Sequence, residues 1–358
     1  MKIGLFGFPG VGKTTLFNAL TGAETPTAGA RRETHLGVAR VPDERLLRLS
    51  ELFHPRKTTH ATVDFVDLVG FQREDAASSF DAEALRTADA LAHVIRAFEG
   101  EIPHSEGSIA PARDAATMET ELILADHSVL ERRQERLAAV AAKKGPRSDE
   151  ATELPLVERC LEHLSGDQPL RTLELAEDEE KRLRGYGLLS SRPLLLVVNV
   201  GEDQVDAIGD PAARFGLEAF AARPHVAVCA ASAQIEMEIA RLPTEDVPAF
   251  MEDLGISEPA ANRVIRSAYD LLGLESFFTV GEDECRAWTI RKGTTARRAA
   301  GVIHSDLERG FIRAEVVDYG DLVELGTMAK AREKGVLRLE GKDYPVQDGQ
   351  ILHVRFNV

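Results

Sequence analysis

The stretch of this sequence whose residue types point most directly to chemistry is Gly7-Phe8-Pro9-Gly10-Val11-Gly12-Lys13-Thr14-Thr15. It has the pattern G-x-x-x-x-G-K-[ST], in which a glycine-rich loop turns its backbone N–H groups toward phosphate oxygens. We expect Lys13 to reach the β- and γ-phosphates of a nucleotide and the Thr14 hydroxyl to bind Mg²⁺. The rest of the predicted cradle is formed by Gly7, Gly10, Val11, Gly12 and Thr15.

The segments on either side of this loop have the patterns that such a loop requires. Residues 2–6 form a short apolar run that is typical of a buried parallel strand. After the loop, the apolar residues recur at helical spacing: Leu16, Phe17, Ala19 and Leu20. A strand before the loop and a helix after it favour a phosphate-binding loop over a glycine-rich turn that matches the pattern by chance.

A second motif follows the alternating stretch at residues 62–67, which predicts a strand. That stretch leads into Asp67-Leu68-Val69-Gly70, a D-x-x-G pattern at a strand end. We expect Asp67 to hold a magnesium-bound water and the Gly70 N–H to contact the γ-phosphate. For a second magnesium hydroxyl the polar loop at 21–34 offers three candidates, with none favoured: Thr25, Thr27 and Thr34.

The base-reading element is predicted where two further apolar strands end. The run at 193–198 leads into Asn199-Val200-Gly201-Glu202, and the run at 224–229 leads into a small-residue loop that contains Ser232. Ligands of doubly wound sheets bind at the carboxyl ends of the strands. We therefore expect Asn199, Val200, Glu202 and Ser232 to contact the base.

The same element favours ATP over GTP. GTPases use Asn-Lys-x-Asp, whose aspartate accepts hydrogen bonds from guanine. Here Glu202 is one methylene longer than that aspartate, and Val200 stands in place of the lysine that would stack on the base. A lost polar match can lower affinity by orders of magnitude, whereas adenine could be met by Asn199 and the Val200 backbone. GTP remains the alternative.

Composition limits the class of protein. The chain has 358 residues, a net charge of −16 and a pI near 5.2, which predicts two or three domains and argues against broad non-specific nucleic-acid binding. Its three cysteines are widely separated, as expected in a reducing cytoplasm. No apolar run approaches bilayer length and the N-terminus leads directly into a strand, so we expect neither a membrane span nor a signal peptide.

Two segments differ from the rest of the chain in their residue patterns. Residues 115–144 carry a heptad column of Ile123, Leu130 and Leu137, which predicts a helical hairpin with a returning helix near Cys160. The last segment, 276–358, combines short strand-like runs with local basic residues and with the aromatic residues Trp288, Phe311 and Tyr319. Such a segment could bind RNA, and the alternative is a solvated face with core aromatics.

Taken together, these residues resemble the Obg-like ATPases, the YchF group of translation-factor-related P-loop proteins. The resemblance covers nearly the whole chain. It rests on the three motifs above and on distinctive C-terminal blocks: Arg286-Ala287-Trp288-Thr289, Gly310 to Val316, Leu339 to Tyr344, Val346 to Gly349 and Phe356-Asn357-Val358.

The resemblance implies an α/β fold with three parts. A discontinuous P-loop domain with a doubly wound, mostly parallel sheet covers residues 1–112 and 190–273. A helical hairpin is inserted at residues 113–189, and a small α+β domain of the β-grasp, TGS-like type covers residues 276–358.

The resemblance also implies the residue that positions the hydrolytic water. In Ras-type proteins a glutamine after D-x-x-G orients this water, but Phe71 stands there in this chain. The family assigns the role to a histidine in the loop after the next strand, and His104 is the matching position. Two departures affect the switch loops, because the family's magnesium-sensing threonine falls on Arg31 and the segment after D-x-x-G is shortened to Phe71–Asp75.

The resulting hypothesis is a ribosome-associated P-loop ATPase that slowly hydrolyses ATP to ADP and phosphate as a molecular switch. The alternatives are a GTPase switch, a nucleotide-regulated ribosome- or RNA-binding module with negligible turnover, and a redox-responsive binding protein that uses Cys229. Expected cofactors are Mg²⁺ with ATP, with K⁺ as an open second candidate. Expected partners are ATP, the ribosome and RNA through the C-terminal domain, and a cytoplasmic monomer without membrane contact is expected.

Overall fold

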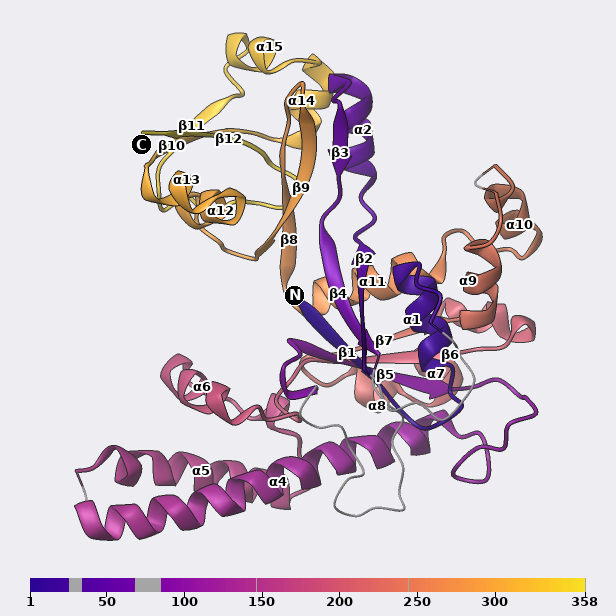
Figure 1. The fold of residues 1–358 in the computed structure, drawn as a ribbon, viewed down its shortest axis with the longest axis vertical. Helices are drawn as coiled ribbons and strands as arrows, with labels where there is room; N and C mark the ends of the chain where they lie inside the picture. The colour runs from indigo at the N-terminus through magenta and orange to yellow at the C-terminus, as the bar shows by residue number, and fades with distance from the viewer. Residues whose placement is uncertain (26–33, 68–84, 146, 244, 358) are drawn as a thin grey trace. The chain divides into compact units, whose positions relative to one another are not determined.

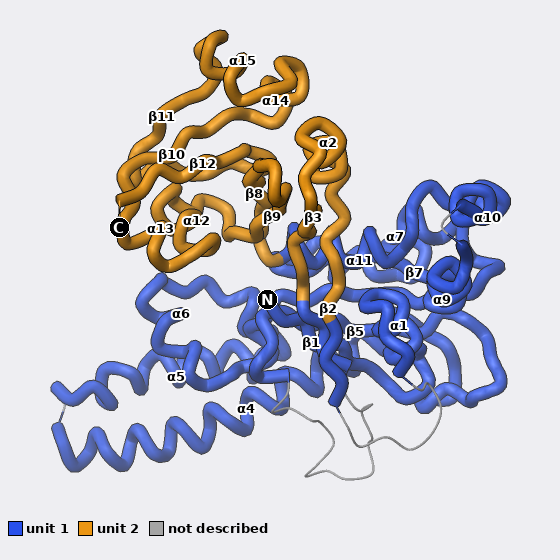
Figure 2. The backbone as a smooth tube through the Cα atoms, turned by 45° about the horizontal axis from the view of Figure 1, so that its top comes forward, with its two compact units in different colours: residues 1–37, 64–271 blue, residues 38–63, 272–358 orange. Residues whose placement is uncertain are grey.

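The computed structural model describes residues 1–358 except 26–33, 68–84, 146, 244 and 358. The chain divides into two compact units, and neither is a continuous stretch of sequence (Figure 2). The first unit contains residues 1–37 and 64–271, and the second contains residues 38–63 and 272–358.

The first unit is built on a six-stranded sheet with the order β2-β4-β1-β5-β6-β7. The pairs β1–β4, β1–β5, β5–β6 and β6–β7 are all parallel. The strands are β1 (Lys2–Phe6), β2 (His35–Arg40), β4 (Thr62–Asp67), β5 (Ala90–Arg96), β6 (Leu194–Asn199) and β7 (Val226–Ala231). This arrangement confirms the prediction of a doubly wound, mostly parallel sheet.

Burial explains why these segments form central strands. Every residue of β5 and β6 is buried, as expected for parallel strands covered on both faces. The helices α1 (Lys13–Thr21), α9 (Ala233–Ile239) and α11 (Ala260–Leu271) lie on one side of the sheet, and α4 (Pro111–Lys144) lies on the other (Figure 1). Smaller helical elements complete this region: η3 (Glu202–Ile208), α7 (Pro211–Phe215), α8 (Glu218–Ala221) and α10 (Val247–Asp253).

The inserted segment is the helical hairpin that the heptad column predicted. Helix α4 packs against α5 (Asp149–Ser165), and the column residues Ile123, Leu130 and Leu137 share one buried cluster with Cys160. The chain returns to the sheet through η1 (Leu170–Thr172), α6 (Glu177–Leu183) and η2 (Arg184–Tyr186).

Buried polar contacts fix the base of this hairpin. Asp126 on α4 is fully buried and accepts hydrogen bonds from the backbone N–H groups of Leu189 (2.8 Å) and Ser190 (2.7 Å). Glu119, also on α4, forms ion pairs with Arg171 and Arg223. These contacts satisfy charges that would be costly to bury alone.

The second unit has a mixed sheet with the order β11-β10-β12-β8-β9-β3. Its strands are β3 (Lys57–Thr59), β8 (Leu274–Thr279), β9 (Glu284–Arg291), β10 (Phe311–Val317), β11 (Arg338–Glu340) and β12 (Ile351–Phe356). Its helices are α2 (Glu44–Phe53), α12 (Ala296–Ile303), α13 (Ser305–Arg309), α14 (Tyr319–Leu325) and α15 (Met328–Glu333). These elements match the predicted small α+β C-terminal domain.

One segment of the second unit comes from far upstream in the chain. The predicted boundaries place residues 38–63 in the nucleotide-binding domain, but they belong to the same compact unit as residues 272–358. Strand β3 pairs in parallel with β9, and Arg45 on α2 forms an ion pair with Asp348 at 2.7 Å. The unit therefore needs two distant stretches of chain.

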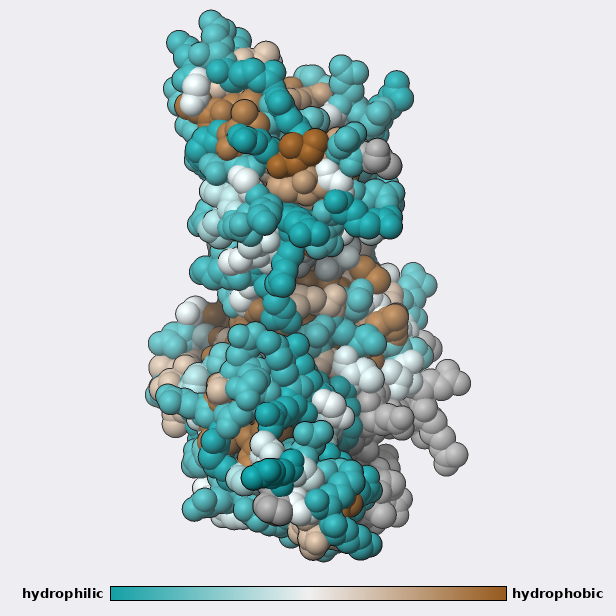
Figure 3. Space-filling view, turned by 90° about the vertical axis from the view of Figure 1, so that its left-hand side faces the viewer, coloured by the Kyte–Doolittle hydropathy of each residue, from teal (hydrophilic) through white to brown (hydrophobic). Residues whose placement is uncertain are grey.

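The aromatic residues of the second unit serve its core more than its surface. Trp288 and Phe311 pack against the buried cluster, and the Trp288 indole N–H donates to Thr279 Oγ1 at 3.0 Å. Among the described residues of this unit, large apolar side chains remain exposed at Val38, Leu47, Val302, Ile312, Leu339 and Phe356. Most side chains visible in Figure 3 are hydrophilic, and the apolar ones lie in small groups between them.

Candidate nucleotide-binding site

The loop between β1 and α1 depends on its glycines for both conformation and space. Gly7, Gly10 and Gly12 have φ values of 146°, 72° and 90°, a region that favours glycine. A Cβ at Gly7 would lie 2.5 Å from the Val94 carbonyl oxygen, and one at Gly12 would lie 2.2 Å from Asn199 Nδ2. The loop is thus held tightly against the ends of β5 and β6.

Lys13 is buried at the centre of this loop. Its ammonium group donates to the carbonyl oxygens of Gly7 (3.0 Å) and Phe8 (2.7 Å). Burial lowers the Lys13 pKa to about 8, and the negative charge of Asp67 opposes this shift. A bound phosphate would supply the counter-charge that the neutral carbonyl groups do not.

Thr14 and Asp67, the two predicted magnesium residues, are brought together. Thr14 Oγ1 donates to Asp67 Oδ2 at 2.8 Å, although 53 residues separate them. The pairing of Leu5 with Asp67 in adjacent strands places the carboxylate beside the loop. No group of three or more His, Cys, Asp or Glu residues suited to a metal occurs among the residues outside the gaps. A hydroxyl with one carboxylate fits Mg²⁺, which keeps water and phosphate oxygens as its other ligands.

Several predicted phosphate-side residues cannot be placed. Gly70, Phe71, Thr27 and Arg31 lie outside the described residues. Thr25 is described, and its backbone exchanges two hydrogen bonds with the side chain of Asn18, at 3.0 and 2.6 Å. Thr34 is exposed. The identity of a second magnesium hydroxyl therefore stays open.

Asn199, predicted to meet the base, is largely occupied by protein contacts. Its Nδ2 donates to the Val11 carbonyl oxygen and its Oδ1 accepts from the Ala233 N–H, both at 2.9 Å. The side chain is 4% exposed. Asn199 therefore connects the phosphate loop to the start of α9, and one amide hydrogen and one lone pair of Oδ1 are left for a ligand.

The other predicted base contacts do not converge as side chains. Val200 is buried and its N–H donates to the Ala231 carbonyl oxygen, whereas Glu202 is exposed at the start of η3. Ser232 is buried and its hydroxyl accepts from the Ile235 N–H as the cap of α9. Cys229 is buried in β7, and burial raises its pKa to about 12, which disfavours the reactive thiolate.

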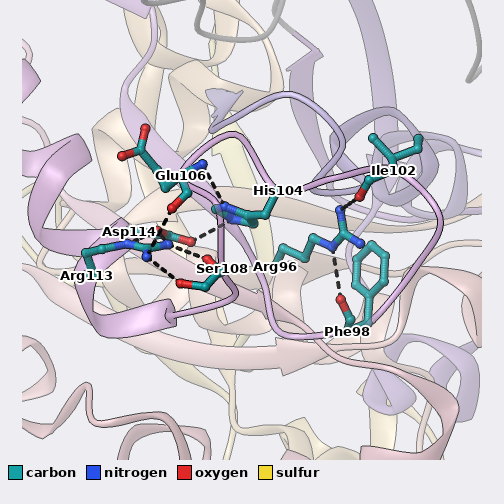
Figure 4. A network of polar contacts seen from close by, with 8 residues as sticks. All are labelled: Arg96, Phe98, Ile102, His104, Glu106, Ser108, Arg113 and Asp114. Carbon is teal, nitrogen blue, oxygen red and sulfur yellow. Dashed lines mark hydrogen bonds and ion pairs between the residues drawn. The ribbon is translucent and has the colours of Figure 1, made fainter.

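His104 lies in the loop between β5 and α4 (Figure 4). The centres of the His104 and Phe8 rings are 6.1 Å apart in an edge-on contact. The imidazole Nδ1 accepts the Glu106 backbone N–H at 3.1 Å. Its Nε2 lies 2.9 Å from Asp114 Oδ2. The predicted catalytic residue is thus near the phosphate loop but already engaged at both nitrogens.

Three residues near the site were not predicted. Arg96, at the end of β5, organises the loop by donating to the carbonyl oxygens of Phe98 (2.9 Å) and Ile102 (2.8 Å). Phe98 lies 3.5 Å from the position of a Cβ at Gly201, which places it beside the predicted base-reading loop. Asp114 contacts His104. A charged residue ending a buried apolar strand is a signal that could have identified Arg96, whereas Asp114 resembles an ordinary acid in the first turn of a helix.

Comparisons with known proteins agree with this geometry. Residues 2–130 match the family MMR_HSR1, described as a 50S ribosome-binding GTPase, and residues 274–357 match YchF-GTPase_C, described as a protein of unknown function (DUF933). The "Ribosome-binding ATPase YchF" of Bacillus subtilis (strain 168) is 41% identical, with 100% of each chain covered. The chain belongs to the YchF family.

Other members of the YchF family support this assignment. The protein of the same name from Escherichia coli O157:H7 is 40% identical, over 100% of this chain and 99% of its own length. The solved "Structure of the Schizosaccharomyces pombe YchF GTPase" is 29% identical, covers 99% of this chain and 97% of its own, and superimposes with a TM-score of 0.85. As a YchF protein with an assembled phosphate loop, the chain is a P-loop nucleotide hydrolase. Across the described ranges, no helix has the length and apolar character needed to span a membrane.

Proposed function

We propose that this YchF protein binds Mg²⁺ and ATP, slowly hydrolyses ATP to ADP and phosphate, and works as a molecular switch on the ribosome. The observation that carries the proposal is the contact between Thr14 Oγ1 and Asp67 Oδ2 beside the buried Lys13. The names of the relatives, which include both "ATPase" and "Ribosome-binding", support the choice of nucleotide and partner.

The proposed phosphate site uses this chain's residues as follows. Backbone N–H groups of Gly7, of residues 10–15 and of Gly70 surround the phosphates, and Lys13 exchanges its two carbonyl contacts for phosphate oxygens. Thr14 and Asp67 would hold Mg²⁺, which would neutralise charge on the β- and γ-phosphates. His104 orients the attacking water, a role that can supply about 10²–10⁴ in rate.

The proposed preference for ATP depends on what the base end lacks. A buried Val200 cannot stack on a base as the lysine of a GTPase does, and Glu202 is not the shorter aspartate that pairs with guanine. Asn199, the Val200 backbone, Glu202 and Ser232 are the proposed surroundings of the adenine. The names "50S ribosome-binding GTPase" and "YchF GTPase" keep GTP as the competing nucleotide.

We also propose further partners and a second cofactor. Besides the ribosome, RNA is proposed to bind the second unit, where Arg313, Arg355 and Phe356 are exposed on β10 and β12. Arginine and aromatic side chains suit contacts with phosphates and unstacked bases. K⁺ is a proposed second cofactor, which a comparison of turnover in potassium and sodium salts would test. A cytoplasmic monomer remains a prediction.

The test of the proposed function is nucleotide turnover measured with purified protein and Mg²⁺, using ATP and GTP, with and without ribosomes. We expect ATP to be hydrolysed faster than GTP, and we expect protein and ribosomes to cosediment. Faster hydrolysis of GTP would identify a GTPase. Nucleotide binding without turnover under any of these conditions would leave a nucleotide-regulated binding module.

A further inference from the structure

The loop that carries His104 is held by a network of polar contacts among its own residues and those of the adjoining elements (Figure 4). Arg96 fixes its first half through the carbonyl oxygens of Phe98 and Ile102. Arg113 fixes its second half by donating to Ser108 Oγ at 2.9 Å and to the Ser108 carbonyl oxygen at 2.5 Å. His104 lies between these two anchored halves, and its side chain is 3% exposed.

The contacts of the His104 ring define its tautomer. Nδ1 accepts a hydrogen bond from the Glu106 backbone N–H, so this nitrogen carries no proton in the neutral ring. The proton therefore sits on Nε2, which lies 2.9 Å from Asp114 Oδ2. Among the described residues, neither Nε2 nor Oδ2 has a hydrogen-bond partner, so this close contact is the polar contact that the two buried atoms make. The carboxylate thus stabilises one of the two neutral forms of the imidazole.

Asp114 is itself a rigid anchor. It lies in the first turn of α4 and is 1% exposed. Its second oxygen, Oδ1, accepts from Arg113 Nη2 at 2.7 Å and from Arg113 Nε at 3.0 Å. One oxygen is therefore fixed by an arginine while the other faces the histidine. This division resembles the way in which a buried aspartate orients a histidine in hydrolytic triads.

We propose that Asp114 is a positioning residue for His104, which it holds in the tautomer with Nε2 protonated so that Nδ1 is the basic nitrogen. The inference rests on the proposed role of His104 in hydrolysis. Nδ1 is the nitrogen that can exchange partners, because the Glu106 N–H belongs to a part-buried loop, whereas Asp114 is buried and anchored.

In the step that this arrangement serves, the attacking water replaces the Glu106 N–H as the partner of Nδ1. The water oxygen forms a bond to the γ-phosphorus while the bond from that phosphorus to the β–γ bridging oxygen breaks, and its electron pair stays on ADP. The water proton passes to Nδ1, and the carboxylate of Asp114 stabilises the imidazolium that forms. The proton is later returned to phosphate or solvent.

The test is single-turnover ATP hydrolysis by His104→Ala, Asp114→Asn, Asp114→Glu and the double variant His104→Ala/Asp114→Asn. We expect His104→Ala to lower kcat about 100-fold and Asp114→Asn to lower it at least about tenfold. The KM for ATP should be unchanged in both. Asp114→Glu should recover part of the loss, and the double variant should be no slower than His104→Ala.

A matched control is Asp126→Asn, which removes another fully buried carboxylate from the same helix. This variant should lose thermal stability because Leu189 and Ser190 lose an acceptor, but its kcat should stay within about twofold of wild type. An equal loss of kcat in Asp126→Asn and Asp114→Asn would mean that Asp114 acts only through the fold, which would overturn the inference.

The histidine itself provides a readout that a merely structural role would not change. In ¹⁵N spectra of the full protein, with the signal assigned by comparison with His104→Ala, wild-type His104 should show a protonated Nε2 and an unprotonated Nδ1. Asp114→Asn should show a mixture of tautomers.

The outcomes separate this inference from the proposed function. If His104→Ala lowers kcat and Asp114→Asn does not, the positioning role is wrong and the role of His104 survives. If His104→Ala has no effect on kcat, the proposed role of His104 is wrong. A rise in kcat in Asp114→Asn would mean that the carboxylate holds His104 away from the reaction, which also overturns the inference.

Discussion

The two ends of the nucleotide site are built on opposite principles. At the phosphate end, Lys13 and Thr14 contact groups that a nucleotide and Mg²⁺ can replace, namely loop carbonyls and the carboxylate of Asp67. At the base end, the Asn199 side chain forms hydrogen bonds with the backbone of Val11 and Ala233, and Glu202 is exposed to solvent. The side chains that would bind phosphate and Mg²⁺ are therefore already positioned in the free protein. At the base end, Asn199 mainly holds the phosphate loop in place.

The largest expected effect would come from breaking the phosphate end. Asp67→Asn removes the charge beside Thr14, and we expect turnover of ATP with Mg²⁺ to fall at least about 100-fold. Asp64→Asn, on the same strand, is the control and should keep wild-type turnover, because Asp64 pairs with Lys2 at the start of β1 and its carboxylate lies 3.9 Å from the N-terminal amine. Undiminished turnover in Asp67→Asn would show that Asp67 does not hold Mg²⁺ in the reaction.

The second effect concerns the hydrogen bonds of Asn199 at the base end. Asn199→Ala leaves the buried Val11 carbonyl and Ala233 N–H without their partner, so we expect the free energy of unfolding without nucleotide to drop by about 2 kcal/mol. Affinities for ATP and GTP should fall by similar factors. Asn262→Ala on α11 is the control and should change both quantities little. If only the preference between the two nucleotides changed, Asn199 would be a base-reading residue.

A smaller effect is expected from Glu202→Asp, which restores the aspartate of the GTPase motif. Calorimetric titration with Mg²⁺ should show ATP binding tighter than GTP in wild type, and the substitution should erode this preference by about tenfold. Asp203→Asn, one residue along, should leave the preference unchanged. Tighter GTP binding by the wild-type protein would place it functionally with the GTPases.

The smallest expected effect is a change in the protonation of Lys13 when ATP binds. Its pKa is about 8 in the free protein because it is buried, and phosphate oxygens favour its charged form, so its pKa should rise on binding. ATP binding near pH 8 should therefore take up a fraction of a proton, and affinity should weaken as pH rises above 8. Calorimetry in two buffers of different ionisation enthalpy measures this uptake. Binding without proton uptake would mean that Lys13 is already fully charged.

Local sequence patterns predicted much of this molecule. The phosphate loop, its flanking strand and helix, and the heptad column of α4 depend on residues close together in the chain, and the structure confirms each of them. The role of Asp67 and Thr14 in holding Mg²⁺ stays a prediction, and the two side chains are in contact because parallel strand ends meet at one edge of a sheet.

The features that escaped prediction depend on distant residues or on irregular strands. Strand β3 is three residues long and mostly exposed, so nothing in its sequence indicates that it pairs with β9. Strand β10 carries exposed Ile312 and Arg313 followed by four buried residues, and its pairing with β12 shifts register there, which hides the usual alternation. The contact between His104 and Asp114 depends on how the loop folds back onto α4, which residue spacing does not specify.

The division of the chain into two interlaced units has a consequence for how such a protein can evolve. Residues 38–63 contribute α2 and β3 to the second unit. The chain then re-enters the nucleotide-binding unit at residue 64, just before Asp67 at the end of β4. A single recombination breakpoint near residue 272 would separate the C-terminal segment from part of its own sheet. The second unit is therefore not a cassette that can be transferred whole between genes, and its sequence and that of the nucleotide-binding loops must be inherited together.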